Sequence, residues 1–421
     1  MRLTRVQIEN FRCFEKLTLD LDPHFTLIAG GNGSGKTTII RALVWALNSV
    51  ASRIGRERFA LDQADVRLVR QQVGDQVRFE PRFPTLVSSD AELGGKHSAW
   101  EVGGNAFNAL SLLRSSSGGW ETALKRLDSP GEEENRTAFP LLVCYPAGRA
   151  WNRNTSPIQW NNILKAKPSR NDGYSRWQNA SSDLVRLTTW LVREQLISLQ
   201  RKRETVALKT VKRVLIAALE GAVDIEHNVE EGEVTVTFTN GEAHRLGELS
   251  DGQRNMLAMF GDLAIRAVQL NGFLGEDAPA GTPGVVLIDE LDLHLHPRWQ
   301  RKIVHLLKET FPQVQFIATS HSPQIIGELP PEQIIILENG VPSHPAESFG
   351  RDTNFILREV MDAEPRNTDV AEALAQIRTL IDDEHYDDAL QRIDEWRQKI
   401  GSDPELERAE ALVKRITLIG A

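Results

Sequence analysis

A glycine-rich octapeptide between a predicted strand and a predicted helix constrains this chain more than any other feature. Residues Gly30–Thr37 read GGNGSGKT and fit the phosphate-loop pattern G-x-x-x-x-G-K-[S/T]. The apolar run Phe25–Ala29 precedes the loop, and Lys36–Leu47 has the spacing of an amphipathic helix. The glycines let the backbone wrap round phosphates, so that main-chain N–H groups face the anion. A plain turn is the ordinary alternative, but the strand–loop–helix context favours ATP binding.

The loop predicts individual contacts with ATP and Mg²⁺. We expect Lys36 to reach the β- and γ-phosphates and the hydroxyl of Thr37 to hold the metal. Arg12 lies in a predicted turn between two strands, where it could contact the nucleotide or simply belong to an edge hairpin; the residues leave both open. The nucleotide-binding residues predicted in this part of the chain are Arg12, Gly30, Asn32, Gly33, Ser34, Gly35, Lys36, Thr37 and Thr38.

Two later motifs extend the predicted site. The sequence LSDGQ at Leu249–Gln253 opens a predicted helix, so Ser250 and Gly252 lie where free N–H groups and the helix dipole favour an anion. Taken alone, Ser-Asp-Gly is also a plain helix cap. A buried apolar strand then ends just before Asp289 and Glu290. We expect Asp289 to hold Mg²⁺ and Glu290 to act as the catalytic base that orients the attacking water.

His321 follows the next predicted strand, and we expect it to bond the γ-phosphate as a second catalytic residue. Asp292 and Gln253 complete the predicted nucleotide-binding set. His294 and His296 resemble a metal-binding pair only superficially, because no third ligand is evident.

The phosphate loop, LSDGQ, an apolar strand ending in Asp-Glu and a strand-end histidine occur in the order found in ATP-binding-cassette ATPases. With NFRCF before the loop and HLHP after the acids, the chain resembles the SMC/RecF/Rad50-like branch. That resemblance implies an α/β fold: an ABC-type P-loop ATPase with a central mixed or parallel sheet, a helical insertion and a helical C-terminal appendage. It also implies that Ser250 and Gly252 bind ATP held by another protomer, giving a homodimer or higher oligomer through an ATP sandwich.

Within this branch the chain is most similar to the PtuA family of the Septu anti-phage system and its retron-associated relatives. The similar blocks include FPLLVCYPAGRAW, LSDGQRNMLAMFGDLAIRA, LIDELDLHLHPRWQRKIV and FGRDTNFILREVMDAEPR. The resemblance implies an HNH-type nuclease partner, encoded beside the ATPase, which the ATPase oligomer holds and regulates.

The motif positions suggest four regions. They are an N-terminal lobe at 1–150, a helical insertion at 151–225, a second lobe at 226–350 and a helical region at 351–421. The last region is predicted as helices at Val370–Ile381, Tyr386–Ile400 and Glu405–Ile416. It carries no catalytic constellation, so we expect it to make partner or oligomer contacts.

Composition and charge limit the partners. A net charge of −9 argues against a wholly electrostatic nucleic-acid binder. It leaves room for a local basic groove on Trp151–Lys212, so DNA or RNA remains a candidate partner. Two cysteines without metal-ligand spacing fit a reducing compartment. The N-terminus lacks an apolar signal segment and no run has transmembrane length, which predicts a cytoplasmic location without a membrane partner.

Three further predictions concern a set of glutamines, one arginine and one hairpin turn. Gln63, Gln71 and Gln72 are equal candidates for a residue that senses the γ-phosphate through Mg²⁺. Arg149 is predicted either to face solvent or to lie at the carboxyl end of a central strand, where ligand contacts gather. Asn240-Gly241 predicts a type I′ hairpin turn.

Three other functions agree less well with the sequence, and a fourth remains open. Lys36 and Ser250 are 214 positions apart, which leaves room for a large insertion that transporter cassettes do not usually carry. A fused nuclease needs a second domain after the cassette, yet the residues after Gly350 read as helices. Sustained heptads of a long coiled coil are missing. A stand-alone RecF/SMC-like DNA-binding ATPase in DNA repair remains the alternative.

Overall fold

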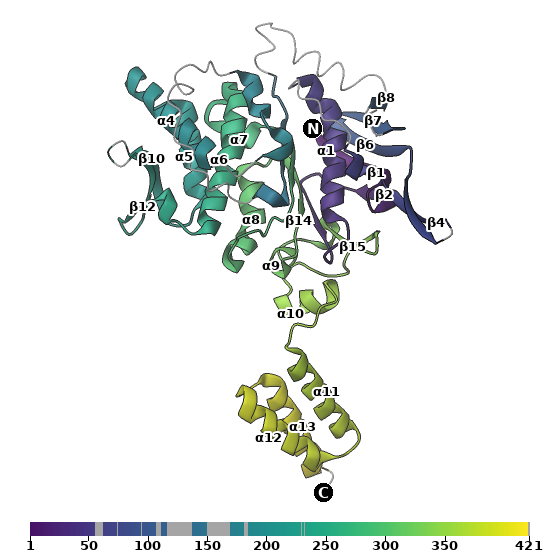
Figure 1. The fold of residues 1–421 in the computed structure, drawn as a ribbon. Helices are drawn as coiled ribbons and strands as arrows, with labels where there is room; N and C mark the ends of the chain where they lie inside the picture. The colour runs from purple at the N-terminus through teal and green to yellow at the C-terminus, as the bar shows by residue number, and fades with distance from the viewer. Residues whose placement is uncertain are drawn as a thin grey trace. The chain divides into compact units, whose positions relative to one another are not determined.

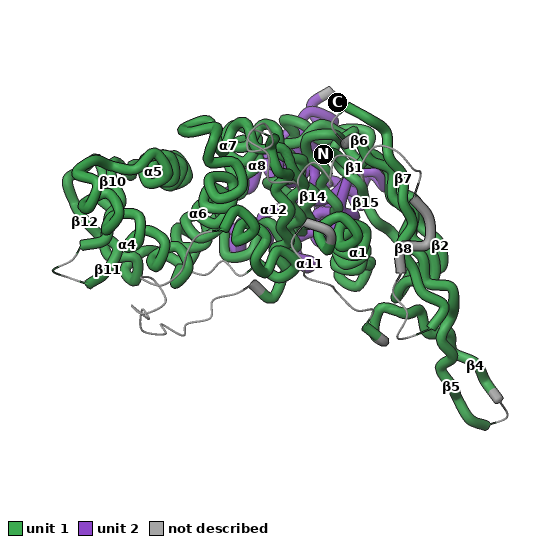
Figure 2. The backbone as a smooth tube through the Cα atoms, turned by 90° about the horizontal axis from the view of Figure 1, so that it is seen from above, with its two compact units in different colours: residues 1–351 green, residues 352–421 purple. Residues whose placement is uncertain are grey.

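The computed structural model describes residues 1–54, 62–73, 75–93, 95–106, 111–115, 137–149, 169–180, 184–228, 230 and 232–419. These residues form two compact units, residues 1–351 and residues 352–421, which Figure 2 shows in different colours. The first unit holds every motif that the sequence assigns to ATP.

A six-stranded sheet forms the centre of the first unit. Its order is β16-β15-β3-β14-β13-β9, and all neighbours are parallel except the antiparallel edge strand β16. Strands β3, β9, β13 and β14 are buried along their whole length, as expected for parallel strands covered on both faces. The strands are β3 (Phe25–Ala29), β9 (Leu141–Tyr145), β13 (Gly284–Ile288), β14 (Val314–Thr319), β15 (Ile334–Glu338) and β16 (Val341–Ser343).

A second, antiparallel sheet has the order β2-β1-β6-β7-β8. Helix α1 (Lys36–Ile54) contacts strands of both sheets and so fills the space between them (Figure 1). The strands are β1 (Arg2–Phe11), β2 (Phe14–Asp20), β6 (Thr85–Leu93), β7 (Lys96–Gly104) and β8 (Ser111–Ser115), with a separate hairpin β4 (Leu68–Val73) and β5 (Gln76–Pro81).

The long helices of the first unit gather round α6 (Asp251–Asn271), which contacts α4, α5 and β9. A small sheet packs beside them, with the strands β10 (Ala222–Asn228), β11 (Glu233–Phe238) and β12 (Ala243–Arg245). The other helices of this unit are α4 (Leu184–Arg201), α5 (Val206–Ala218), α7 (Ala278–Gly281), α8 (Pro297–Thr310) and α9 (Pro323–Ile326), with short turns including η1 (Gln63–Asp65), η4 (Arg170–Tyr174) and η5 (Trp177–Asn179).

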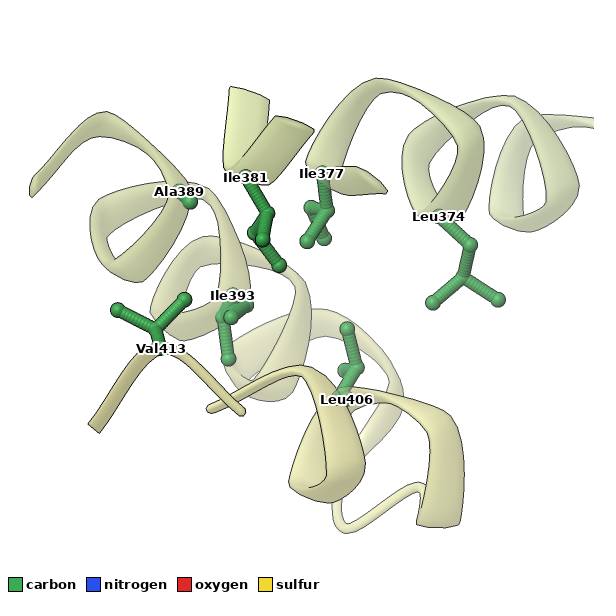
Figure 3. Packing of buried hydrophobic residues seen from close by; sticks show 7 residues of the cluster. All are labelled: Leu374, Ile377, Ile381, Ala389, Ile393, Leu406 and Val413. Atoms are coloured by element: carbon green, nitrogen blue, oxygen red, sulfur yellow. The ribbon is translucent and has the colours of Figure 1, made fainter. Parts of the chain in front are cut away.

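The second unit begins with α10 (Thr353–Phe355) and a π-helical turn at Ile356–Val360. Three helices joined by short loops follow: α11 (Thr368–Asp382), α12 (Tyr386–Ile400) and α13 (Pro404–Ile419). Apolar residues of all three helices form one core (Figure 3). Its buried members are Leu374, Ile377, Ile381, Ala389, Ile393, Leu406 and Val413. The unit therefore has its own hydrophobic core.

The predicted fold class is confirmed: the first unit is an α/β ATPase fold and the tail is helical. Three local expectations differ from the structure. Of the two alternatives left open for Arg149, the central-strand one is wrong, because β9, which leads to Arg149, lies at the edge of its sheet. The sequence patterns also assigned no strand to the segments that form β4 and β8.

The third error concerns the β11–β12 turn. Only Gly241 has a positive φ (83°), whereas a type I′ turn also needs one at Asn240. The N–H of Gly241 bonds the carbonyl of Phe238 at 2.9 Å, and the N–H of Phe238 bonds the carbonyl of Glu242 at 2.9 Å. This is a three-residue loop ending in a glycine bulge.

Candidate functional site

The phosphate loop joins β3 to α1, as its sequence predicts. Lys36 is only 7% exposed, and its Nζ donates to the carbonyls of Gly30 at 2.9 Å and Gly31 at 2.8 Å. The hydroxyl of Ser34 is buried without a hydrogen-bond partner. An ammonium held only by loop carbonyls and an orphaned hydroxyl are groups that the oxygens of a phosphate satisfy, so the loop fits a nucleotide.

The β1–β2 turn packs directly on this loop. Gly35 has a φ of 104°, and a Cβ there would lie 2.5 Å from Cζ of Phe14 and 2.9 Å from Sγ of Cys13. The thiol of Cys13 also reaches the hydroxyl of Thr38 at 3.8 Å. The turn therefore fixes the path of the loop, and only glycine fits at position 35. Thr37, the predicted metal ligand, is exposed.

Strand order brings the acids to this loop. Because β3, β14 and β13 are parallel neighbours, their carboxyl ends meet at one edge of the sheet. Asp289 follows β13 and is 2% exposed. Thr319, the last residue of β14, donates its hydroxyl to Oδ1 of Asp289 at 2.6 Å and accepts the N–H of Glu290 at 2.8 Å. One buried hydroxyl thus binds the carboxylate of Asp289 and the backbone of Glu290. The backbone of Glu290 is in the left-handed region, with a φ of 54°.

The pKa shifts place five predicted residues within electrostatic reach of one another. Burial lowers the pKa of the Lys36 ammonium, while Asp289, Glu290 and Asp292 act in the opposite direction. Burial also lowers the pKa of His321, and the positive charge of Lys36 lowers it further. The same three carboxylates raise it. Burial and the charge of Lys36 thus favour the neutral form of the His321 imidazole.

Asp292 organises the turn beside His321. Its Oδ1 accepts the hydroxyl of Ser320 at 2.6 Å and the N–H of His321 at 3.4 Å. This contact fixes the segment that carries the histidine.

The LSDGQ motif lies at the start of α6, as predicted. Ser250 caps the helix and exchanges hydrogen bonds with Gln253, whose Oε1 accepts the serine hydroxyl at 2.9 Å. A Cβ at Gly252 would lie 3.0 Å from the carbonyl of His294, so the helix start packs closely on the turn after the acids. Within the described ranges, no hydrogen bond or ion pair joins these three motif residues to the phosphate loop of the same chain.

Arg12 binds a buried carboxylate. Its Nε donates to Oδ1 of Asp65 at 2.9 Å, and its own N–H bonds the carbonyl of Asp65 at 3.0 Å. Asp65 also accepts from Arg41 and from the indole of Trp45. The arginine side chain remains 27% exposed. The structure therefore gives Arg12 an anchoring contact, and its contact with the nucleotide stays a prediction.

Several other predicted site residues either lie on other elements or are not among the described residues. Gln71 and Gln72 are on the exposed β4–β5 hairpin. The side chains of Gln63 and Arg149 are not described, and residues 151–168, the first part of the candidate basic groove at Trp151–Lys212, lie outside the described residues. His294 and His296 belong to no group of three potential metal ligands within the described ranges.

Sequence reasoning missed Thr319 and Asp65. The signal for Thr319 was available, since it is a strand-end hydroxyl just before Ser320-His321, level with the acids of the neighbouring strand. Nothing local marks Asp65 as the acceptor for three distant side chains.

Comparisons with known proteins place this geometry in a family. A model described as "AAA domain" matches residues 5–231, more than half of the chain, and one described as "AAA domain, putative AbiEii toxin, Type IV TA system" matches residues 152–327. Among helices in the described ranges, none is both long and apolar enough to cross a membrane.

Named relatives agree with the family match. The retron Ec83 probable ATPase of Escherichia coli is 23% identical over 92% of this chain and 81% of its own length. The Septu protein PtuA of Bacillus mycoides is 35% identical over 39% of this chain and 22% of its own length.

Among solved structures, the SMC head domain from Thermotoga maritima aligns with 82% of this chain and 98% of its own, at 15% identity and a TM-score of 0.43. The family match rests on the sequence models and relatives, together with a phosphate loop, strand-end acids and signature helix in one α/β unit. The chain belongs to the AAA-domain family and is related to the retron ATPases and to PtuA.

Proposed function

We propose that this chain hydrolyses ATP as the ATPase subunit of an anti-phage defence complex and thereby controls an HNH-type nuclease. The observation that supports the catalytic part is that Lys36, in the loop after β3, lies within electrostatic reach of Asp289 and Glu290, which follow β13, with the parallel strand β14 between these two strands. Relatedness to the retron ATPases and PtuA supports the defence role.

Each residue of this site has a proposed task. Lys36 neutralises charge on the β- and γ-phosphates, and His321 donates a hydrogen bond to the γ-phosphate as a neutral imidazole. Thr37 and Asp289 would hold Mg²⁺, which supplies charge stabilisation between the phosphates. Glu290 orients the attacking water, and Thr319 keeps its backbone in place.

The signature residues serve a second protomer in this proposal. Ser250 and Gly252 lie at the N-terminus of a 21-residue helix, where the dipole favours a phosphate. They make no described hydrogen bond to their own phosphate loop. An ATP sandwich between two copies would give each loop a signature helix.

The catalytic assignment is tested by Glu290→Gln. We expect unchanged ATP affinity and ATP turnover reduced by about 100-fold or more, because the amide no longer accepts a proton from water. Glu328→Gln, which changes an exposed acid in the same unit, serves as the matched control. Turnover of Glu290→Gln close to that of the control would refute the assignment.

Residues 352–421 are the proposed site of partner contact. They contain 17 acidic and 9 basic residues, a net charge of −8 out of −9 for the whole chain. They also form a compact unit, whose helices α11, α12 and α13 have their own core. Such charge favours a partner with a basic surface. The division of residues 1–350 into two lobes and an insertion remains a prediction.

Two experiments test the partner. A tagged pull-down from the native host, read by native mass spectrometry, should recover a stoichiometric small HNH-type protein. Deletion of 367–421 should abolish that recovery while leaving ATP binding intact; retained recovery would refute the role of the tail. An ATPase recovered alone, and dimerising on DNA with ATP, would instead favour a RecF-like DNA clamp.

A further inference from the structure

A second polar cavity lies apart from the nucleotide site, where η4 and η5 meet α4 and α6. It has a volume of about 480 Å³, within the range of roughly 300–1,000 Å³ typical of small-ligand sites. Its polar lining consists of Asp172, Ser175, Arg176, Arg186, Arg266 and Gln269. The three arginines come from three separate segments of the chain, and none belongs to the ATP-binding motifs.

Asp262 of α6 anchors two of these arginines. Its side chain is 6% exposed and accepts from Nε of Arg266 at 2.8 Å and from Nη1 of Arg186 at 2.7 Å. The hydroxyl of Tyr145, the last residue of β9, donates to the same carboxylate at 2.7 Å. Arg266 is 1% exposed, and its Nη1 donates to the carbonyl of Gly173 at 2.7 Å. The cavity wall is thus a built and buried network.

This network leaves donors without acceptors. Within the described ranges, Nη2 of Arg266, Nε of Arg186 and the whole guanidinium of Arg176 make no hydrogen bond. Gln269 uses its carbonyl oxygen for a weak contact of 3.5 Å with Arg186, and its amide N–H groups also have no partner there. These donors are not fully buried, so water satisfies them in the free protein. Their convergence on one cavity offers several hydrogen bonds to an acceptor-rich ligand.

The charge of the residues around the cavity also favours an anion. Three arginines but only one acid, Asp172, line the cavity. Asp172 already accepts the N–H of Ser169 at 2.8 Å, and the anchoring carboxylate of Asp262 is engaged by Arg186, Arg266 and Tyr145. Burial lowers the pKa of Arg186, and the like charges of Arg266 and Arg176 add to the effect, while Asp262 opposes it. Crowded guanidinium groups in a partly desolvated cavity create a positive potential that an anion relieves.

We propose that this cavity binds a phosphate group, presented by Arg176, Arg186, Arg266 and Gln269. Planar guanidinium forks match the oxygens of a phosphate in pairs, and donors approaching from three segments suit a tetrahedral anion better than a planar one. The phosphate is either free inorganic phosphate or the phosphomonoester of a nucleotide or nucleic-acid end. This site is independent of the ATP site and adds a second phosphate-binding function to the chain.

The test uses the full chain carrying Lys36→Ala, which disables the phosphate loop as a competing site. Thermal unfolding is followed while inorganic phosphate replaces chloride at constant ionic strength. We expect a saturable rise in the unfolding temperature, because a ligand that binds only the folded state stabilises it. Adding Arg176→Gln should weaken the phosphate affinity about tenfold or more. Arg201→Gln, an exposed arginine at the end of α4, should leave it unchanged.

The side chain of Arg176 is exposed and makes no described hydrogen bond, and its backbone bond to Asn179 does not depend on the side chain. Its replacement should therefore not disturb the fold, which the unfolding temperature without phosphate checks. Gln269→Leu provides a second variant with the same expected loss. A 5′-phosphorylated thymidine dinucleotide distinguishes a strand end from free phosphate, with the unphosphorylated dinucleotide as its control. A phosphate shift that is absent, or that persists in both variants, would overturn the proposal, as would an equal shift from the unphosphorylated dinucleotide.

Discussion

Replacement of Thr319 by valine should uncouple the two acids of the site. The hydroxyl of Thr319 binds Asp289 at 2.6 Å and the N–H of Glu290 at 2.8 Å, and the side chain is fully buried. Valine keeps the shape and removes both bonds. A lost bond to a charged group costs about 1.5–3 kcal/mol and a buried unsatisfied N–H about 1–3 kcal/mol. We expect the free energy of unfolding to fall by about 3 kcal/mol.

The catalytic effect should exceed what stability alone explains. Residues that orient metal ligands typically change activity by about 10–100-fold, so ATP turnover should fall by that factor while ATP affinity is kept. Turnover is measured as phosphate release and affinity with a fluorescent ATP analogue. Thr319→Ser retains the hydroxyl and should behave like the unmodified chain.

Thr26→Val is the matched control for this prediction. Thr26 is also buried, on β3, and its hydroxyl accepts the N–H of Asp22 at 2.9 Å, away from the acids. This variant should lose stability but keep turnover. If Thr319→Val kept ATP turnover within about threefold of Thr26→Val, the hydrogen bonds of the Thr319 hydroxyl to Asp289 and Glu290 would have no catalytic role.

Two further predictions concern the loop and the histidine. Gly35→Ala should abolish ATP binding, because the new Cβ would lie 2.5 Å from Phe14 at a φ of 104°; Gly31→Ala, with nothing within 4 Å, should bind normally in the same titration. His321 has a pKa below its usual 6.5, through burial first and then the charge of Lys36. The unfolded chain therefore binds the extra proton more readily, so this contribution to stability is complete above pH 6.5 and is lost as pH falls further. His321→Gln should flatten the fall in unfolding temperature between about pH 7 and about pH 5, and an unchanged pH profile would contradict it.

Much of the fold could be predicted because its signals are local. The apolar runs before Gly30 and Asp289 are buried strands, and Ser250 caps α6 as its sequence predicts. All three tail helices occur where their periodicity places them. Edge elements such as β4 were missed, because a strand exposed on both faces lacks an apolar alternation.

The sequence by itself determined the chemistry that short contiguous segments carry. A phosphate loop, a pair of acids and a helix cap each require only a few neighbouring residues with fixed dihedral angles and hydrogen bonds. Such segments can be read from Gly30–Thr37 or Leu249–Gln253 without knowing what lies beside them.

Only the tertiary structure decided which of these segments meet. The order β3-β14-β13 places Thr319 between the loop and the acids, although these segments are far apart in the sequence. Likewise, Asp262 binds Arg186 of α4 as well as Arg266 of its own helix, and the cavity beside them also takes Arg176 from the segment between η4 and η5. Strand order and side-chain networks depend on long-range pairing and on the burial of unlike charges, and neither leaves a periodic trace in the local sequence.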